Sequence, residues 1–91
     1  MEDEIVNSRV HTKLAERLRE IREDLYGKHG VQFMADALGV PVGTWLNYEA
    51  GVVLPAHIAL ELIVAARVNP RWLLTGQGEK FVPRDTEPSG D

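Results

Sequence analysis

The sequence predicts a compact all-α domain of five helices. Apolar residues recur at spacings of three and four in several stretches of the chain, which is the period of a helix with one buried face. Glycine and proline residues stand where these stretches end and begin, as they do at helix termini. No stretch alternates apolar and polar residues in the manner of a half-buried strand. A chain of 91 residues with 44% hydrophobic content has room for one modest core.

The first helix is expected from Val10 to about Leu25. Charged residues fill its other faces, Ser8 or Thr12 is placed to cap its start, and Gly27 with Gly30 marks its end. Its apolar stripe consists of Val10, Leu14, Leu18, Ile21 and Leu25.

Two short helices follow. One begins near Val31 and is about two turns long, because Gly39 stands where a helix C-terminal glycine belongs. The next runs from Val42 to about Glu49, starts after Pro41 and closes at Gly51.

The last two helices lie beyond Pro55. The first of them is apolar over almost its whole surface, so we expect a central, well-buried helix. Its apolar positions are Ile58, Leu60, Leu62, Ile63, Ala65 and Ala66. The second has Asn69 as its cap, Pro70 at its first position and Gly76 at its end.

The charge distribution divides the chain into three segments. Residues 1–9 form an acidic N-terminal segment, residues 10–78 form the helical domain, and residues 79–91 form a polar tail expected to be flexible. The net charge is −4, but residues 9–78 have eight Lys and Arg against seven Asp and Glu, a net charge of +1. The domain is therefore not strongly basic, and charge alone does not indicate a nucleic-acid binder.

Several function classes are disfavoured by what the sequence lacks. Without cysteine, disulfides and thiolate metal sites are excluded. No apolar run reaches the roughly 18 residues of a membrane span, and the acidic start is unlike a signal peptide, so we expect a cytoplasmic protein. His11, His29 and His57 are scattered without metal-ligand spacing. No phosphate loop or nucleophile with a base is recognisable, so we expect no enzyme, no cofactor and no bound metal.

The two short helices carry the functional signal. Ala35 is a small residue midway along the first, Gly39 lies four residues later at the turn, and Trp45 is an apolar anchor six residues further on. Ala35 permits close helix packing, Gly39 permits a positive φ, and Trp45 faces the core, as we also expect for Trp72. This is the arrangement of a helix-turn-helix, which places its second helix in the DNA major groove.

The chain resembles the lambda-repressor-like, or XRE/Cro-type, helix-turn-helix family over about residues 13–78. The residues that match the pattern are Ala35, Gly39, Val40, Thr44, Tyr48-Glu49-Ala50-Gly51, Pro55 and Trp72-Leu73-Leu74-Thr75-Gly76-Gln77-Gly78. The resemblance implies a five-helix DNA-binding domain and an ion pair between Arg22 and Glu49 that stabilises the scaffold.

The resemblance also implies which residues face double-stranded DNA. The base-reading positions correspond to Val31 with Gln32, and to Val42, Gly43, Asn47 and Ala50, while Thr44 and Tyr48 are placed to reach phosphates. Lys28 and His29 precede the second helix, where backbone amides and positive charge suit a phosphate. This sequence departs from the family, which usually has glutamine where Val31 stands and polar residues where Val42 and Gly43 stand.

Two functions remain open at this point. The first is a sequence-specific transcriptional regulator, expected to be a repressor that binds a palindromic operator as a homodimer. Its dimer contact is expected around Trp72 and Phe81, with Ile5 to Val10 as a second region. The alternative is a helix-turn-helix module of antitoxin or antirepressor type that binds a protein partner, which the acidic pI and the apolar face of Val42, Gly43 and Leu46 favour.

Overall fold

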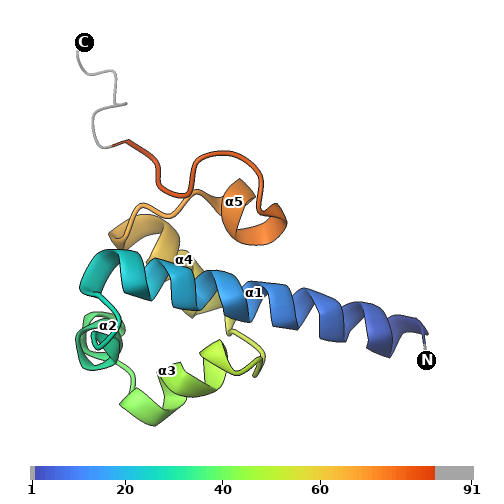
Figure 1. Cartoon of the computed structure of the whole chain (residues 1–91), viewed down its shortest axis with the longest axis horizontal. Helices are drawn as coiled ribbons and strands as arrows, with labels where there is room; N and C mark the ends of the chain where they lie inside the picture. Colours follow the sequence, from blue (N-terminus) through green and yellow to red (C-terminus); the bar gives the residue numbers. More distant parts are fainter. Residues whose placement is uncertain (1, 84–91) are drawn as a thin grey trace. The chain divides into compact units, whose positions relative to one another are not determined.

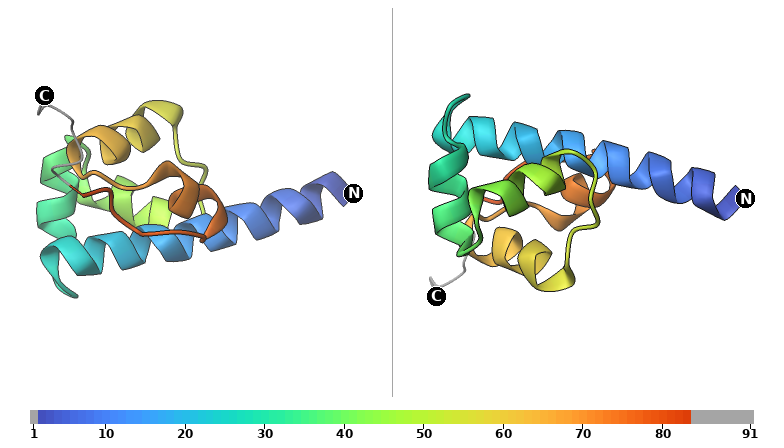
Figure 2. Two further views of the ribbon diagram at one scale, coloured as in Figure 1. Left: turned by 90° about the horizontal axis from the view of Figure 1, so that it is seen from above. Right: turned by 90° about the horizontal axis from the view of Figure 1, so that it is seen from below.

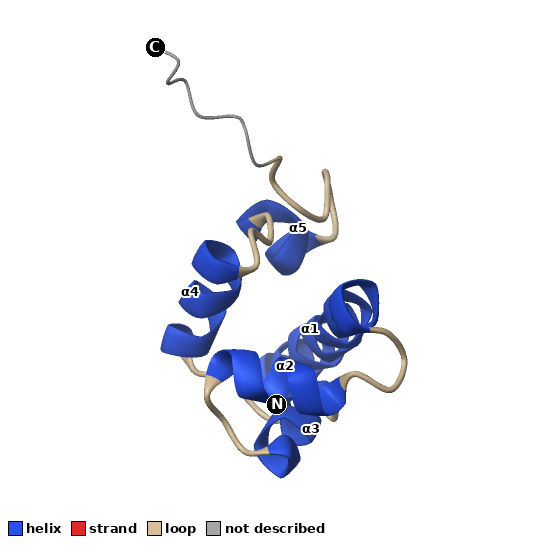
Figure 3. Cartoon of the chain, turned by 90° about the vertical axis from the view of Figure 1, so that its left-hand side faces the viewer, coloured by secondary structure: helices blue, strands red, loops and turns tan. Residues whose placement is uncertain are grey.

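The computed structural model describes residues 2–83, and the side chains of residues 13–83. This part of the chain forms helices and loops, with one isolated antiparallel bridge between Val68 and Phe81 (Figure 3). Five helices are present, as predicted: α1 (Glu2–Tyr26), α2 (Val31–Leu38), α3 (Val42–Glu49), α4 (Ala56–Ala65) and α5 (Pro70–Thr75) (Figure 1). The chain divides after Pro55 into an N-terminal unit with α1 to α3 and a C-terminal unit with α4 and α5.

The first helix begins earlier than the sequence indicated. It starts at Glu2, so Ser8 and Thr12 are internal residues of α1 and neither caps it. Val6 lies four residues before Val10, so the apolar spacing itself reaches further back than the predicted start. The acidic residues Glu2, Asp3 and Glu4 also suit the first turn of a helix, where the helix dipole favours negative charge.

In the N-terminal unit, α2 and α3 pack on the C-terminal half of α1, and its N-terminal half extends beyond them (Figures 1 and 2). Residues from all three helices are buried here: Ala15, Leu18 and Ile21 of α1, Met34 and Ala35 of α2, and Trp45 of α3. Ala35 and Trp45 are both 0% exposed. The close contact of α2 with α3 and the burial of Trp45 confirm the packing predicted for the two short helices.

The turn between α2 and α3 is fixed by backbone hydrogen bonds. Gly39 has a φ of +70°, and the N–H of Val40 donates to the carbonyl oxygen of Ala35 at 3.0 Å. The Gly39 N–H donates to Asp36 O at 3.2 Å, which completes a Schellman motif that ends α2. Pro41 is the N-cap of α3, and its carbonyl oxygen accepts the first helical hydrogen bonds, from the N–H groups of Thr44 and Trp45.

In the C-terminal unit, α5 has the predicted cap. Asn69 Oδ1 accepts a hydrogen bond of 3.0 Å from the Arg71 N–H, Pro70 occupies the first turn, and Gly76 ends the helix with a φ of 81°. Trp72 and Leu73 are buried. The cation of Lys80 lies 5.4 Å from the centre of the Trp72 ring.

Backbone hydrogen bonds continue beyond residue 78, where the sequence predicts the end of the helical domain. The Asn69 N–H donates to Lys80 O at 2.9 Å, and the Val82 N–H donates to Arg67 O at 2.7 Å. Residues 80–82 therefore pair with residues 67–69, although their composition indicated a tail from residue 79. Residues 84–91 of that tail lie outside the described part of the chain.

The expectation of a well-buried α4 is wrong. Ile58 and Leu62 are buried, but Leu60 is 59% exposed, Val64 is 77% exposed and Ala65 is also exposed. An apolar composition does not specify how many neighbours a helix has, and α4 is covered along one stripe only.

Within residues 2–83, no helix combines the length and apolar character needed to cross a lipid bilayer.

Candidate nucleic-acid interface

The inner face of α3 is fixed by the carboxylate of Glu49. Arg22 of α1 donates to it twice, from Nε to Oε2 at 3.0 Å and from Nη2 to Oε1 at 2.9 Å. Trp45, one turn earlier on α3, donates from its indole N–H to Oε2. Arg22 and Glu49 are 6% and 8% exposed. The ion pair expected between these two residues is therefore present, and the tryptophan is an additional partner that the sequence did not reveal.

Arg22 also holds the loop that leads into α2. Its Nη1 donates to the carbonyl oxygen of Lys28 at 2.7 Å and to that of Gly27 at 3.3 Å. One guanidinium thus joins α1, the loop and α3. Sequence reasoning missed these contacts, because backbone carbonyls are present in every residue and nothing in the side-chain pattern distinguishes the two that Arg22 reaches.

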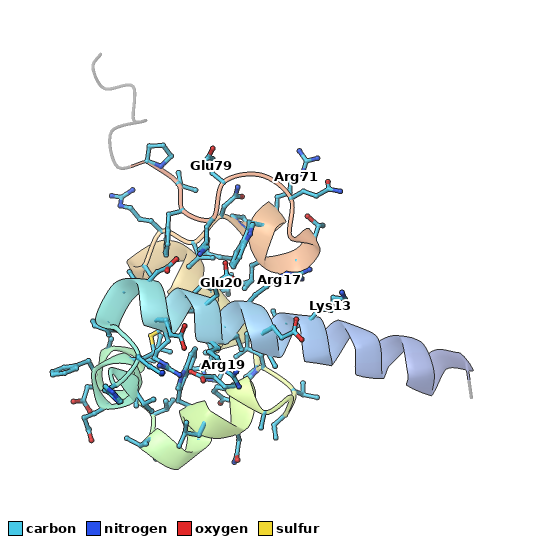
Figure 4. All side chains as sticks on the ribbon, in the orientation of Figure 1. Lys13, Arg17, Arg19, Glu20, Arg71 and Glu79 are labelled. Atoms are coloured by element: carbon cyan, nitrogen blue, oxygen red, sulfur yellow. The ribbon has the colours of Figure 1, made fainter. Side chains whose placement is uncertain are left out.

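The cluster keeps both groups charged. Burial alone would raise the pKa of the Glu49 carboxyl, but the hydrogen bonds from Arg22 and Trp45, together with the positive charges of Arg22 and Arg19, lower it below its usual value. The hydrogen bond to Glu49 raises the pKa of Arg22. Arg19 lies on the side of α1 towards α3, with its Nε 3.8 Å from Glu49 Oε1 (Figure 4).

The loop before α2 is tight. A Cβ on Gly30 would lie 2.3 Å from both the carbonyl oxygen and the Cβ of Tyr26, so this position requires glycine. The Met34 N–H donates to Gly30 O at 3.0 Å, which starts α2 directly after the loop. Lys28 and His29 are exposed on the loop. Their backbone is therefore fixed while their side chains face solvent.

The first turn of α2 holds the next two predicted contact residues. Val31 is half-buried and Gln32 is exposed. The Gln32 amide donates to Asp36 Oδ1 at 3.0 Å, so one of its donors is already in use. Phe33, which sequence reasoning did not select, is 63% exposed and stacks on Tyr26 with ring centres 6.2 Å apart.

The outer face of α3 presents a single stripe to solvent. Its exposed residues, which we call the outer stripe, are Gly43, Leu46, Asn47 and Ala50. They follow the spacing i, i+3, i+4, i+7 of one helix face. Asn47 is the one residue of the stripe whose side chain has hydrogen-bonding groups, and no charged residue belongs to it. Val42 and Thr44, both half-buried, lie next to it.

Tyr48 does not belong to this exposed surface. The sequence placed it where a phosphate would be reached, but it is 7% exposed and its ring packs edge-on against Trp45, with centres 6.0 Å apart. Tyr48 follows Trp45 by three residues and therefore shares its inner face of α3. Its ring is a packing residue in this structure.

Gly43 is not required by the fold of the N-terminal unit. A Cβ at this position would meet nothing within 4 Å, and the residue is inside a regular helix. Glycine costs about 1 kcal/mol of helix stability relative to alanine. The position therefore leaves the backbone of α3 accessible to close approach from outside.

The described residues contain no group of three or more His, Asp and Glu side chains arranged to hold a metal ion. What the N-terminal unit does present is a rigidly held helix with a nearly neutral outer face. The chain matches no protein-family model, no curated protein and no solved structure in the three comparisons made.

Proposed function

We propose that this chain is a sequence-specific DNA-binding transcriptional regulator of the lambda-repressor-like helix-turn-helix family, acting as a repressor on a palindromic operator. The observation that supports the proposal most directly is the construction of α3. Its inner face is fixed by Arg22, Trp45 and Glu49, while its outer stripe is exposed along the whole helix. A recognition helix needs both properties, because it must enter the major groove without changing its position on the scaffold.

The α2–α3 pair supports the same proposal. Two eight-residue helices joined through Gly39, Val40 and Pro41 form a rigid corner, with α3 available for the groove and the start of α2 available for the DNA backbone. Lys28, His29, Val31 and Gln32 lie in or directly after the loop that Arg22 holds. They are the residues we assign to the backbone and to the edge of the groove.

The charges near this surface are sparse. Lys28 is the only Lys or Arg between residues 28 and 51. Each phosphate that a protein neutralises changes the slope of log K against log salt by about −0.9, so we expect a shallow slope of about −1 to −2 per domain. Affinity should therefore depend on groove contacts more than on phosphate contacts, and one domain alone should bind weakly.

A homodimer would overcome this weak single contact. Two copies on a two-fold operator place their recognition helices about one DNA turn apart. The dimer contact is expected around Trp72, but this residue is only 8% exposed and offers little surface to a partner. The neighbouring Leu74 is 71% exposed and is the better candidate on α5. The side chains of Ile5 to Val10 lie outside the described residues.

Selection of bound duplexes from a random DNA pool tests the proposal. We expect a palindromic sequence to be enriched and retained at low salt. Asn47→Ala should then weaken binding to that sequence by about 5-fold to 150-fold. Glu61→Ala, at an exposed position of α4, is the control and should leave binding unchanged. Failure to retain any duplex at low salt would overturn the proposal.

A second candidate function rests on exposed apolar residues in the outer stripe and in the segment that follows α3. Leu46 is 44% exposed, and Val52 and Val53, which follow α3, are 54% and 60% exposed. Exposed apolar residues are typical of a protein-binding surface when they form one patch, and these three lie within residues 46–53. A module of this kind would retain no DNA at low salt. Its binding of a protein partner would be lost on Leu46→Asp or Val53→Asp and would depend little on salt.

A further inference from the structure

From the outer stripe we infer that each half-site is rich in A·T pairs, and that the protein reads it through one adenine and the methyl groups of the thymines beside it. Asn47 reads the adenine, and Leu46 and Val42 contact the methyl groups. This inference rests on the proposed function and specifies the bases that the proposed helix recognises.

Asn47 has the chemistry to read adenine. Its side chain is exposed and forms no hydrogen bond with the other described residues, so both its carbonyl oxygen and its N–H groups are available. Adenine presents an acceptor at N7 and a donor at N6 in the major groove, and an asparagine amide pairs with both at once. No other side chain of the outer stripe offers either group.

α3 has no exposed charged side chain with which to read a G·C pair. Guanine is read mainly by Arg or Lys, and the amino group of cytosine by a carboxylate. The only charged residue of α3 is Glu49, which is 8% exposed and accepts hydrogen bonds from Arg22 and Trp45. α3 therefore lacks the charged side chains that most often read a G·C pair.

Apolar residues form a row beside Asn47. Val42, Leu46 and Ala50 follow each other at four-residue spacing, and Leu46 is 44% exposed. Successive members of this row are about 6 Å apart along the helix axis, close to two base-pair steps. The methyl group of thymine is the one apolar group that the major groove displays.

Gly43 makes this contact geometrically possible. Gly43 lies one helical turn before Asn47, beside the row of Val42, Leu46 and Ala50. A Cβ at Gly43 would have no atom within 4 Å, so the surface there is open. Van der Waals contact with a methyl group requires side-chain carbons within about 4 Å. A helix with a glycine on its outer face approaches the bases more closely than one with a bulky residue there.

Replacement of single thymines by uracil tests the inference, because uracil lacks only the methyl group. The full chain is titrated with duplexes that contain the selected half-site. We expect each contacted thymine to show about a fourfold loss of affinity on replacement. In Leu46→Ala, the loss at the thymine contacted by Leu46 should disappear. Uracil in the spacer between half-sites is the matched control and should have no effect.

The outcomes separate this inference from the proposed function. Retention of an A·T-rich half-site that loses affinity when its thymines are replaced by uracil supports the inference. Retention of a G·C-rich half-site, or equal affinity for thymine and uracil at every position, overturns it and leaves DNA binding intact. Failure to retain any duplex overturns both. A circular dichroism melt of Leu46→Ala confirms that the variant is folded, which is expected for a residue that is 44% exposed.

Discussion

Arg22 and Glu49, 27 positions apart in the sequence, meet through two hydrogen bonds, from Nε to Oε2 at 3.0 Å and from Nη2 to Oε1 at 2.9 Å. The same arginine donates to the carbonyl oxygens of Gly27 and Lys28. The pair therefore sets the position of α3 and of the loop before α2 together. Removal of either partner leaves a charge buried on the other, which is far more costly than the loss of a surface ion pair.

Glu49→Gln should lower the free energy of unfolding by about 3 kcal/mol, because the buried guanidinium of Arg22 loses its counter-charge. Urea unfolding followed by tryptophan fluorescence measures the change. Glu61→Gln, an exposed glutamate of α4, is the control and should stay within about 0.5 kcal/mol of the unmodified protein. Equal effects of the two substitutions would show that the buried pair contributes no more than a surface charge.

Acid should weaken the N-terminal unit through the same carboxylate. The folded-state pKa of Glu49 is lowered, so its stabilising effect is complete above the ordinary glutamate pKa of about 4.3 and is lost as the pH falls through the lower folded value. Urea unfolding between pH 7 and pH 3 should show a decline below about pH 4.3. The decline should be shallower in Glu49→Gln, and parallel curves for the two proteins would contradict this assignment.

Gly43→Ala should stabilise the protein and weaken DNA binding. The stability gain is about 0.5 to 1 kcal/mol, because alanine favours a helix and its Cβ meets nothing within 4 Å. Gly30→Ala is the matched contrast and should destabilise, since its Cβ would lie 2.3 Å from Tyr26 O. Thermal melting and DNA titration of both variants check the prediction. A Gly43→Ala protein with higher stability and unchanged DNA affinity would remove Gly43 from the interface.

Arg67→Gly should stabilise the C-terminal unit by about 0.5 kcal/mol. Arg67 has a φ of 58°, a left-handed conformation that costs about 1 kcal/mol for a residue with a Cβ, and the greater freedom of glycine in the unfolded chain offsets part of the gain. Arg67→Ala is the control, because alanine pays the same conformational cost. The melting temperature should rise for the glycine variant alone, and a similar rise for both would exclude backbone strain as the cause.

The sequence was most informative where structure depends on local chemistry. Gly39 and Pro41 delimit α2 and α3, and Asn69 caps α5, because turns and caps are made by residues close in the chain. The Arg22–Glu49 pair was expected from the family resemblance, and the burial of Trp45 from its apolar position in the motif.

Most of the expectations that failed concern features that local pattern does not determine. The predicted start of the first helix at Val10 was too late, because α1 starts at Glu2. The helix that carries Leu60 and Val64 was expected to be well buried, but their exposure depends on which neighbours cover α4. Lys80 was placed in the tail, but the path of the chain after α5 brings its backbone to that of Asn69. The exposure of α4 and the pairing of Lys80 with Asn69 depend on contacts between residues distant in the chain, which residue spacing does not specify.

The two faces of α3 can change in sequence independently of each other. Trp45, Tyr48 and Glu49 anchor the helix from within, whereas the outer stripe contributes little to folding. Under the proposed function, mutations at the four outer positions should therefore alter the DNA sequence that is bound while the protein stays folded. A combinatorial library restricted to these positions should yield mostly folded members, so the same scaffold can be given new specificities by evolution or by engineering.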